Sequence, residues 1–360
     1  METPTQMAKT QGSTNSSEAK PVLSRVFDEH PVIRDRARLP TPPVKAVFDV
    51  IERTIYQRDP GSSFIAHPRF GKTFAIQVLT KQVCATFPQV PVIIISAKGH
   101  ARFSEVAFYT EILENCKHSF SGVGKVSARR SRLINYLWTL SQARNSDRIV
   151  LFIDEAQNWA EAEFSCLRDL SNDLALNDVR VIALLFGQTE LASIRTVLLQ
   201  SKRTDLIGRF MMQQFEFKGL TSLSDLVETM ECYDDVEMSE YPEGSGICYS
   251  EYFLPAAFQG GWRLSKEAGR LWAQFEHAAR EHGGLKQVGM HWVAACIRSF
   301  FVTHIGVDHT GLTGTDADWR QAVAASCFAL SLGVTYDADL QLPVNASIFR
   351  EARPNDCRST

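Results

Sequence analysis

From residue 63 to residue 217 the chain repeats one pattern, in which a short apolar run precedes a segment with apolar residues at helical spacing. Short, nearly continuous apolar runs rich in β-branched residues are typical of strands buried on both faces. Strands that alternate with helices form parallel sheets, because each parallel connection needs a crossover long enough to hold a helix. The pattern therefore predicts an α/β fold with a parallel sheet sandwiched by helices. We expect its strands at Ser63–Ala66, Val90–Ser96, Ile149–Ile153, Val179–Phe186 and Gln214–Phe217.

The stretch Ala66-His67-Pro68-Arg69-Phe70-Gly71-Lys72-Thr73 lies between the first expected strand and an expected helix over Thr73–Phe87. It fits the phosphate-loop pattern G-x-x-x-x-G-K-[ST], except that Ala replaces the first Gly. In such a loop the backbone N–H groups point at a phosphate, Lys72 neutralises the β- and γ-phosphates, and the Thr73 hydroxyl binds Mg²⁺. A chance Gly-Lys-Thr on a surface loop would not account for the strand before it and the helix after it. We expect nucleotide contacts from His67, Pro68, Arg69, Phe70, Gly71, Lys72, Thr73 and Phe74.

Two acids, Asp154 and Glu155, directly follow the third expected strand. At the carboxyl end of a strand beside a phosphate loop, the first acid holds Mg²⁺ and the second orients or deprotonates the attacking water. A solvated acidic pair at a strand end is the ordinary alternative, and the phosphate loop on the same sheet argues against it. We expect Thr73 and Asp154 at the metal and Glu155 as the catalytic base.

Three further polar residues are candidates for contact with the phosphates. Gln188 directly follows the fourth expected strand and could reach the γ-phosphate or the attacking water, or could be an ordinary turn residue. Arg209 precedes the fifth strand, where an Arg can project into a neighbouring subunit's site and stabilise transition-state charge, with Arg203 as its rival. Arg263 opens an expected helix in the C-terminal part and could fold back onto the phosphates, or be solvated there.

Bulk properties exclude several classes of protein. A net charge of -3 gives no global attraction to nucleic acid, so any DNA binding must come from a local basic surface. The eight Cys form no C-x-x-C pair, which favours reduced thiols over a disulfide framework or a zinc ribbon. The polar first residues do not resemble a signal peptide, and no apolar run reaches the ~20 residues of a membrane helix. These features predict a cytoplasmic protein without a membrane partner.

The motifs resemble those of the AAA+ ATPases and, among them, of the TnsC/TniB-type transposition regulators of Tn-seven-like and CRISPR-associated transposons. HPRFGKT (His67–Thr73) resembles that branch's phosphate loop, FIDEAQ (Phe152–Gln157) its Walker B strand end, and LLFGQTEL (Leu184–Leu191) its sensor-one segment. The resemblance covers roughly residues 40–300. The first two motifs are specific for an AAA+-like ATPase, whereas the transposition branch depends on the Pro-Arg of the loop and on the GQTEL string.

The resemblance implies an ATP- and Mg²⁺-dependent ATPase that assembles on double-stranded DNA as a ring or helical filament, with roughly six or seven subunits per turn. It also implies a transposase and a target-selection protein of the TniQ/TnsD type as partners, with hydrolysis dismantling the assembly. The roles carry over to Lys72, Thr73, Asp154, Glu155, Gln188, Arg209 and Arg263.

Two other functions remain open from the sequence. The first is an AAA+ ATPase of another system, such as a secretion-associated or replication-loader type, because secretion ATPases share similar strings. The second is an ATP-binding switch without appreciable turnover. Glu155 argues against the switch, because a protein that does not hydrolyse ATP has less need of the second acid.

DNA contacts are expected from positive side chains that neutralise phosphates without reading the base sequence. Lys98, His100 and Arg102 follow the second expected strand, where the resembled family places its DNA-tracking loop. A second basic cluster is a competing candidate, and both groups could be ordinary solvated surface charges. This second cluster consists of Lys125, Arg129, Arg130 and Arg132.

The pattern changes along the chain give four regions. The polar start predicts a flexible arm, and the loss of strand signal after residue 218 predicts a helical lid with helices over Ser222–Tyr233, Trp262–Glu281, Gln287–His304 and Asp316–Leu332. The expected regions are a flexible N-terminal arm (1–40), an α/β nucleotide-binding core (41–218), a helical lid (219–305) and a C-terminal helix and tail (306–360).

Overall fold

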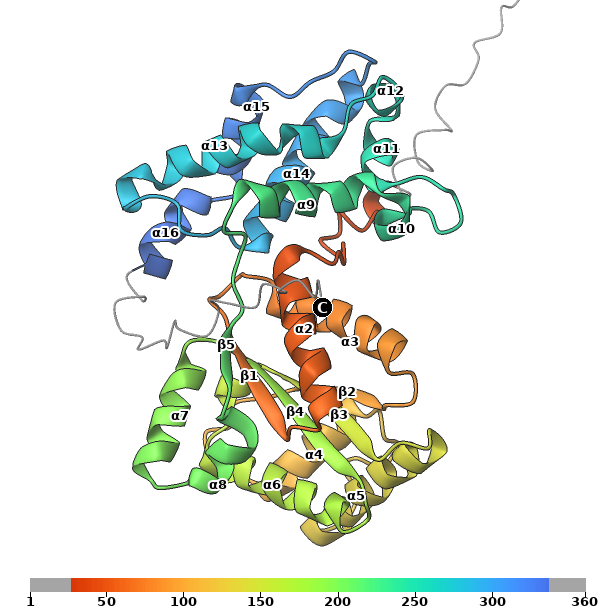
Figure 1. Cartoon of the computed structure of the whole chain (residues 1–360), viewed down its shortest axis with the longest axis vertical. Helices are drawn as coiled ribbons and strands as arrows, with labels where there is room; N and C mark the ends of the chain where they lie inside the picture. Colours follow the sequence, from red (N-terminus) through yellow and green to blue (C-terminus); the bar gives the residue numbers. More distant parts are fainter. Residues whose placement is uncertain (1–26, 337–360) are drawn as a thin grey trace, which may run out of the picture.

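The computed structural model describes residues 27–336 and shows two lobes, an α/β core and a helical lid (Figure 1). The core holds a five-stranded sheet in the order β2-β3-β4-β1-β5, and all of its strand pairs are parallel. This confirms the predicted fold class. The strands are β1 (Gly61–Ile65), β2 (Val92–Ser96), β3 (Arg148–Asp154), β4 (Arg180–Gly187) and β5 (Gln214–Glu216).

Helices cover both faces of the sheet, as the nearly continuous apolar strands require. Along β3, Val150 and Phe152 pack on the face that α2 and α3 cover, whereas Ile149, Leu151 and Ile153 pack on the opposite face, which α4, α5 and α6 cover. The alternation follows from the two-residue period of a strand. The helices of the core are α2 (Pro42–Gln57), α3 (Lys72–Thr86), α4 (Glu105–Asn115), α5 (Val126–Ala143), α6 (Glu161–Ala175), α7 (Glu190–Gln200) and α8 (Thr204–Leu206).

The lid is helical, and it extends beyond its predicted end. Helix α15 packs against α13 and α14, so residues 306–336 belong to the lid and are not a separate tail. The remaining predicted tail, 337–360, lies outside the described residues. The helices are α9 (Leu223–Asp234), α10 (Val236–Ser239), α11 (Tyr249–Phe253), α12 (Pro255–Gln259), α13 (Ala268–Ala279), α14 (Met290–His304), α15 (Asp316–Ala325) and α16 (Phe328–Tyr336).

Two expected lid helices are interrupted. The one expected over Trp262–Glu281 begins as a 3-10 turn, Leu264–Glu267, before α13. The one expected over Asp316–Leu332 breaks at Cys327, whose φ of 59° lies in the left-handed region. Among the described residues, no helix is both long enough and apolar enough to cross a membrane.

Residues 27–40, which belong to the expected N-terminal arm, pack against the lid. His30 is fully buried among the rings of Tyr241, Tyr249, Tyr252 and Phe253, at centroid distances between 4.5 and 4.8 Å. A stretch that is polar overall can still be anchored by one side chain when a partner far along the chain supplies the pocket. Residues 1–26 lie outside the described residues.

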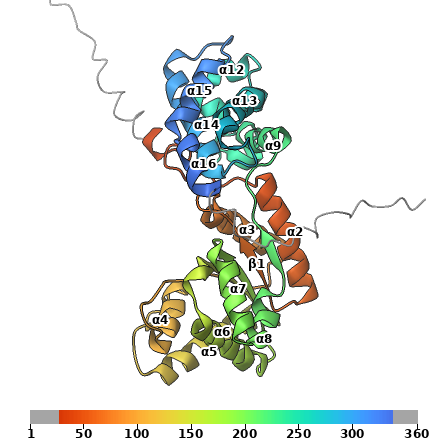
Figure 2. The same ribbon diagram turned by 90° about the vertical axis from the view of Figure 1, so that its left-hand side faces the viewer.

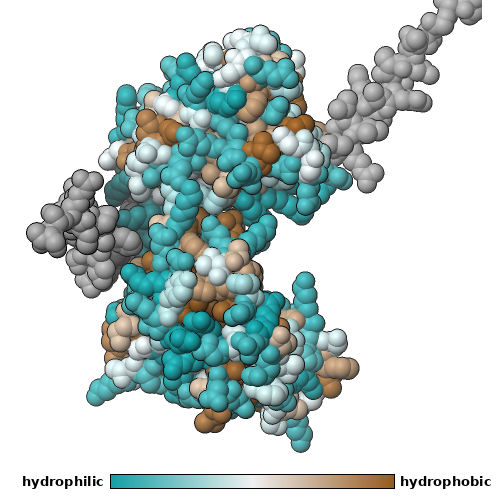
Figure 3. Space-filling model, turned by 45° about the vertical axis from the view of Figure 1, so that its right-hand side comes forward, coloured by the Kyte–Doolittle hydropathy of each residue, from teal (hydrophilic) through white to brown (hydrophobic). Residues whose placement is uncertain are grey.

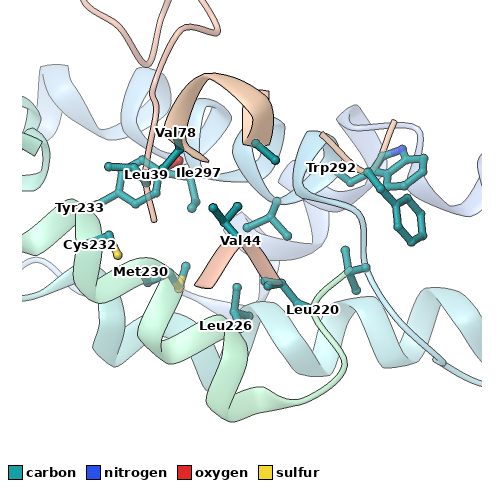
Figure 4. Packing of buried hydrophobic residues seen from close by; sticks show 14 of the residues in the cluster. Leu39, Val44, Val78, Leu220, Leu226, Met230, Cys232, Tyr233, Trp292 and Ile297 are labelled. Atoms are coloured by element: carbon teal, nitrogen blue, oxygen red, sulfur yellow. The ribbon is translucent and has the colours of Figure 1, made fainter. Parts of the chain in front are cut away.

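Core and lid share one hydrophobic cluster where they meet (Figure 4). Leu39, three residues before α2, and Val44, in its first turn, belong to this cluster together with Leu226 and Tyr233 of α9. From the side, α3 and the upper end of α2 approach the lid, while the rest of α2 runs beside β1 (Figure 2). The phosphate loop therefore lies in the waist between the two lobes.

Candidate nucleotide-binding site

The phosphate loop connects β1 to α3, as the sequence predicts. Gly71 has a φ of 91° and is the N-cap of α3, so the first turn of that helix presents its unpaired N–H groups to the loop. Arg69 also has a positive φ, 65°. Ala66 is buried, and its N–H donates to the Gly187 carbonyl at 3.0 Å, so a small side chain is accommodated at this strand end.

The other loop residues divide between core and surface. His67 and Phe70 are buried, with ring centroids 5.4 Å apart, whereas Pro68 and Arg69 are exposed. Phe74, at the start of α3, lies under the guanidinium of Arg38, whose Cζ is 3.8 Å from the ring centroid. His67 therefore shapes the loop, while Phe74 faces the waist.

Lys72 is buried, with 6% of its surface exposed, and no ion pair to it was found among residues 27–336. Burial lowers the pKa of its ammonium, while the nearby carboxylates of Glu155, Asp154 and Glu190 act in the opposite direction. A buried ammonium that makes no direct ion pair with these carboxylates, at the N-terminus of a helix, favours a bound anion.

Thr73 and Asp154 meet across the sheet edge, where the Thr73 hydroxyl donates to Asp154 Oδ2 at 2.8 Å. Asp154 is buried, and this burial raises the pKa of its carboxyl group, against the opposing hydrogen bond from Thr73. A hydroxyl and a carboxylate oxygen side by side are the ligand types that Mg²⁺ prefers, with phosphate and water oxygens completing its shell. The two residues fit the predicted metal site.

Glu155 and Gln188 also come together. Glu155 follows β3 in a left-handed conformation, with φ 54°, and its Oε2 accepts from Gln188 Nε2 at 3.2 Å. A second amide, that of Gln157, donates to the same Oε2 at 2.5 Å and accepts from the Gln188 N–H at 3.0 Å. The sequence analysis did not single out Gln157, although its position two residues after the second acid was a signal.

Arg209 lies far from the phosphate loop of its own chain. Its carbonyl is next to Gly61, at the start of β1, whereas the loop follows Ile65 at the other end of that strand, about 13 Å further along. Its guanidinium donates to Asn172 Oδ1 at 2.7 Å, which is a neutral partner. The rival, Arg203, is bound to the carboxylates of Glu161 and Asp205.

The structure does not bring Arg263 to the loop. Its guanidinium lies 3.6 Å from the ring centroid of Phe258 and donates to the Phe258 and Trp262 carbonyls at 2.9 and 2.6 Å. The lid meets the loop through the start of α14 instead, where the Trp292 ring lies edge-on to Phe70. The helix that opens with Arg263 packs on other lid helices, which its sequence alone does not reveal.

A mostly apolar cavity of about 150 Å³ adjoins the loop in the waist. The space-filling view shows apolar side chains between the two lobes (Figure 3). Three separate parts of the chain line the cavity, namely residues 32–44, the loop with α3, and the lid. Its lining includes Arg38, Leu39, Phe74, Tyr233 and His291. Because they come from three parts of the chain, no local motif predicts them.

Of the three candidate DNA contacts, two have acidic partners on α4. Lys98 Nζ is 3.7 Å from a Glu114 carboxylate oxygen, and His100 Nε2 is 3.3 Å from a buried Glu111 oxygen. Arg102 is exposed, and no partner for it was found in the described part of the chain. The three residues share one loop, directly after β2.

The second basic cluster is largely engaged within the core. Arg129 and Arg132 donate to carbonyls of the turn at 120–124, and Arg130 pairs with Asp173 at 2.6 Å. These contacts anchor the start of α5. The loop after β2 is therefore the stronger of the two candidates for DNA contact.

The parallel sheet, with a loop between β1 and α3 that fits the phosphate-loop pattern, defines a phosphate-loop type of α/β fold, and comparison with known proteins narrows this class. Residues 60–194 match the family model described as an AAA domain. The fold is similar to that of the Aeropyrum pernix ORC2 protein in its ADPNP–ADP complexes, at 13% identity over 83% of this chain and 71% of that one, with a TM-score of 0.53. The ADP form of that protein gives 13% identity, 85% and 73% coverage, and a TM-score of 0.51.

These matches show that the chain has the AAA+ fold, and residues 60–194 are the part similar to the AAA domain model. At 13% identity the likeness to ORC2 extends to the fold alone. Among curated proteins, no match to the chain was found.

Proposed function

We propose that the protein is a Mg²⁺-dependent ATPase that assembles on double-stranded DNA and regulates transposition. One observation carries the enzymatic part. The edge of the sheet that follows β1, β3 and β4 brings together a buried Lys72, the Thr73–Asp154 pair and a Glu155 held by Gln188. Charge neutralisation, metal ligation and water activation are the three tasks of phosphoryl transfer to water.

Each residue has a defined task in that reaction. Lys72 and the N–H groups of the loop bind the β- and γ-phosphates, and Glu155 orients a water and accepts its proton as the water oxygen attacks the γ-phosphorus. The bond from that phosphorus to the bridging oxygen breaks, and ADP leaves. Mg²⁺, when held by Thr73 and Asp154, supplies positive charge to the phosphate oxygens. Gln188 contacts the γ-phosphate or the same water.

The cavity in the waist supports a nucleotide rather than a simple phosphate as the ligand. It is mostly apolar, lies beside the loop, and has an aromatic ring and a guanidinium, those of Phe74 and Arg38, in its lining. Flat heteroaromatic rings pack well on such groups. The fold neighbour with ADPNP and ADP bound is consistent with this assignment.

Assembly on DNA is proposed from the placement of two arginines. Arg209 lies at the end of β1 remote from its own phosphate loop, so it is suited to a neighbouring subunit's site. Arg102 offers positive charge on the exposed loop that also carries Lys98 and His100. The transposition role, with a transposase and a TniQ/TnsD-type protein as partners, is supported by the Pro-Arg of the phosphate loop and the GQTEL string.

The test combines turnover with direct imaging. Purified protein is mixed with double-stranded DNA and either ATP or a slowly hydrolysed analogue, and phosphate release and electron micrographs are recorded. We expect Mg²⁺-dependent phosphate release, and rings or filaments threaded by DNA with the analogue. Monomers indifferent to DNA and nucleotide would refute the assembly. The genes beside this one test the transposition role: a transposase gene whose product binds the protein would support it, whereas secretion or replication genes would refute it.

A further inference from the structure

Gln157 makes two hydrogen bonds that connect the predicted base to the strand beside it. Its Nε2 donates to Glu155 Oε2 at 2.5 Å, and its Oε1 accepts from the backbone N–H of Gln188 at 3.0 Å. Gln188 Nε2 donates to the same Glu155 oxygen at 3.2 Å. The three residues therefore form a closed ring of contacts between the ends of β3 and β4.

The orientation of the Gln157 amide follows from its neighbours. A backbone N–H can only donate, so the amide atom facing Gln188 N must be the oxygen. The NH₂ group is then turned to Glu155, whose carboxylate can only accept when ionised. Exchanging the two ends of the amide would place donor against donor and acceptor against acceptor. The contact thus fixes one arrangement.

The backbone conformation at Glu155 and Gly187 leaves room for these three hydrogen bonds. Glu155 adopts a left-handed conformation, with a φ of 54°, which is uncommon for a residue with a side chain. Gly187 precedes Gln188, and a Cβ on it would lie 3.0 Å from Gln157 Oε1 and 2.9 Å from a Leu191 methyl carbon. A side chain at Gly187 would therefore push the amide of Gln157 out of place.

We infer that Gln157 is a positioning residue for hydrolysis, which holds the Glu155 carboxylate through one oxygen and leaves the other to accept the proton of the attacking water. This inference depends on the proposed ATPase function. Gln157 is only half-buried, so the core does not need it for packing. Its two hydrogen bonds are what a substitution would remove.

Two substitutions of similar size show whether Gln157 acts through its hydrogen bonds or only by filling space. Gln157→Met keeps the length and loses both hydrogen bonds, whereas Gln157→Glu keeps the shape and can still accept from Gln188 but repels Glu155. We expect both to lower kcat by roughly tenfold or more, with Glu the more severe, because a displaced base loses part of its contribution. KM and nucleotide affinity should stay within about twofold, since binding depends on the loop.

Two controls test whether the loss of turnover is specific to Gln157 and acts through Glu155. Gln142→Glu makes the same charge change on the exposed side of α5 and should leave turnover unchanged. In a Glu155→Gln background, Gln157→Met should add no further loss, because a residue that acts through Glu155 has nothing left to position.

The possible failures are distinct. Wild-type kcat in Gln157→Met or Gln157→Glu would overturn the inference while leaving the ATPase function intact. The inference would also be overturned if these variants lost kcat and nucleotide affinity equally, or if Gln157→Met lowered turnover further in the Glu155→Gln background. Absence of turnover in the wild-type protein on DNA would instead refute the ATPase function, and the inference with it.

Discussion

At the phosphate loop, the ammonium of Lys72 is buried and has no ion pair within residues 27–336, and we propose that a nucleotide phosphate binds it. We expect Lys72→Ala to weaken nucleotide binding by roughly 100-fold, as is typical when one partner of a buried charge pair is removed. Titration with a fluorescent ATP analogue measures this. Lys81→Ala, an exposed lysine on the same helix, is the control. Equal affinity in both variants would refute the assignment of the loop.

His30 gives the docking of residues 27–40 a pH dependence. Burial lowers the pKa of its imidazole from 6.5 to about 3, so the docked segment excludes the proton that the detached segment binds. The stability of docking is therefore complete above about pH 6.5 and is lost progressively as the pH falls from there toward 3. At about pH 5 the loss reaches up to about 2 kcal/mol.

Hydrogen exchange of residues 27–40 measures this effect. We expect faster exchange, relative to α13, at about pH 5 than at about pH 7.5 after correction for the intrinsic rate. His30→Phe keeps a ring among the aromatic side chains and should remove most of this difference. A pH response that is unchanged in His30→Phe would show that another group controls the segment.

At the scale of elements, the sequence was sufficient wherever the signal is local. The phosphate loop, the acids after β3 and Gln188 after β4 are found together because parallel strands end at the same sheet edge. Helix α7 was not expected, and the contacts of Arg263 and the lining of the cavity were not accessible. The lining of the cavity depends on how the lid packs on the core, and residues as far apart in the chain as Arg38 and His291 leave no periodic trace in one sequence.

The contribution of the loop after β2 to DNA binding can be tested by removing its positive charges. We expect Arg102→Ala to weaken binding to DNA of any sequence and to reduce the slope of log affinity against log salt by about one unit. Lys98→Ala should have a smaller effect, because Glu114 already neutralises part of its charge. Fluorescence anisotropy over a range of salt concentrations measures both. An unchanged slope for Arg102→Ala would exclude this loop from the DNA interface.

For the whole molecule, the separation of Arg209 from its own phosphate loop predicts a site shared between subunits. Arg209→Ala and Lys72→Ala should each lose turnover, and a mixture of the two should recover part of it. In a mixed assembly, some interfaces pair an intact loop with an intact arginine. Phosphate release across mixing ratios measures this recovery.

Arg203→Ala, mixed in the same way with Lys72→Ala, is the comparison for the shared site. Arg203 is bound to two carboxylates of its own chain, so we expect its loss to loosen the contact between α6 and α8. A mixture of Arg209→Ala and Lys72→Ala that shows only the sum of its components would place the arginine in the site of its own chain.

The anchored segment at residues 27–40 has a consequence for motion. Within residues 27–336, the backbone passes between lid and core twice, once from His30 to the start of α2 and once from β5 to α9 (Figure 1). Lid and core also pack on each other through the shared hydrophobic cluster, and the two chain crossings leave a rotation about the line through both as the movement that the backbone restricts least. We expect the lid to swing about that axis, so that the cavity in the waist widens and narrows with a single angle.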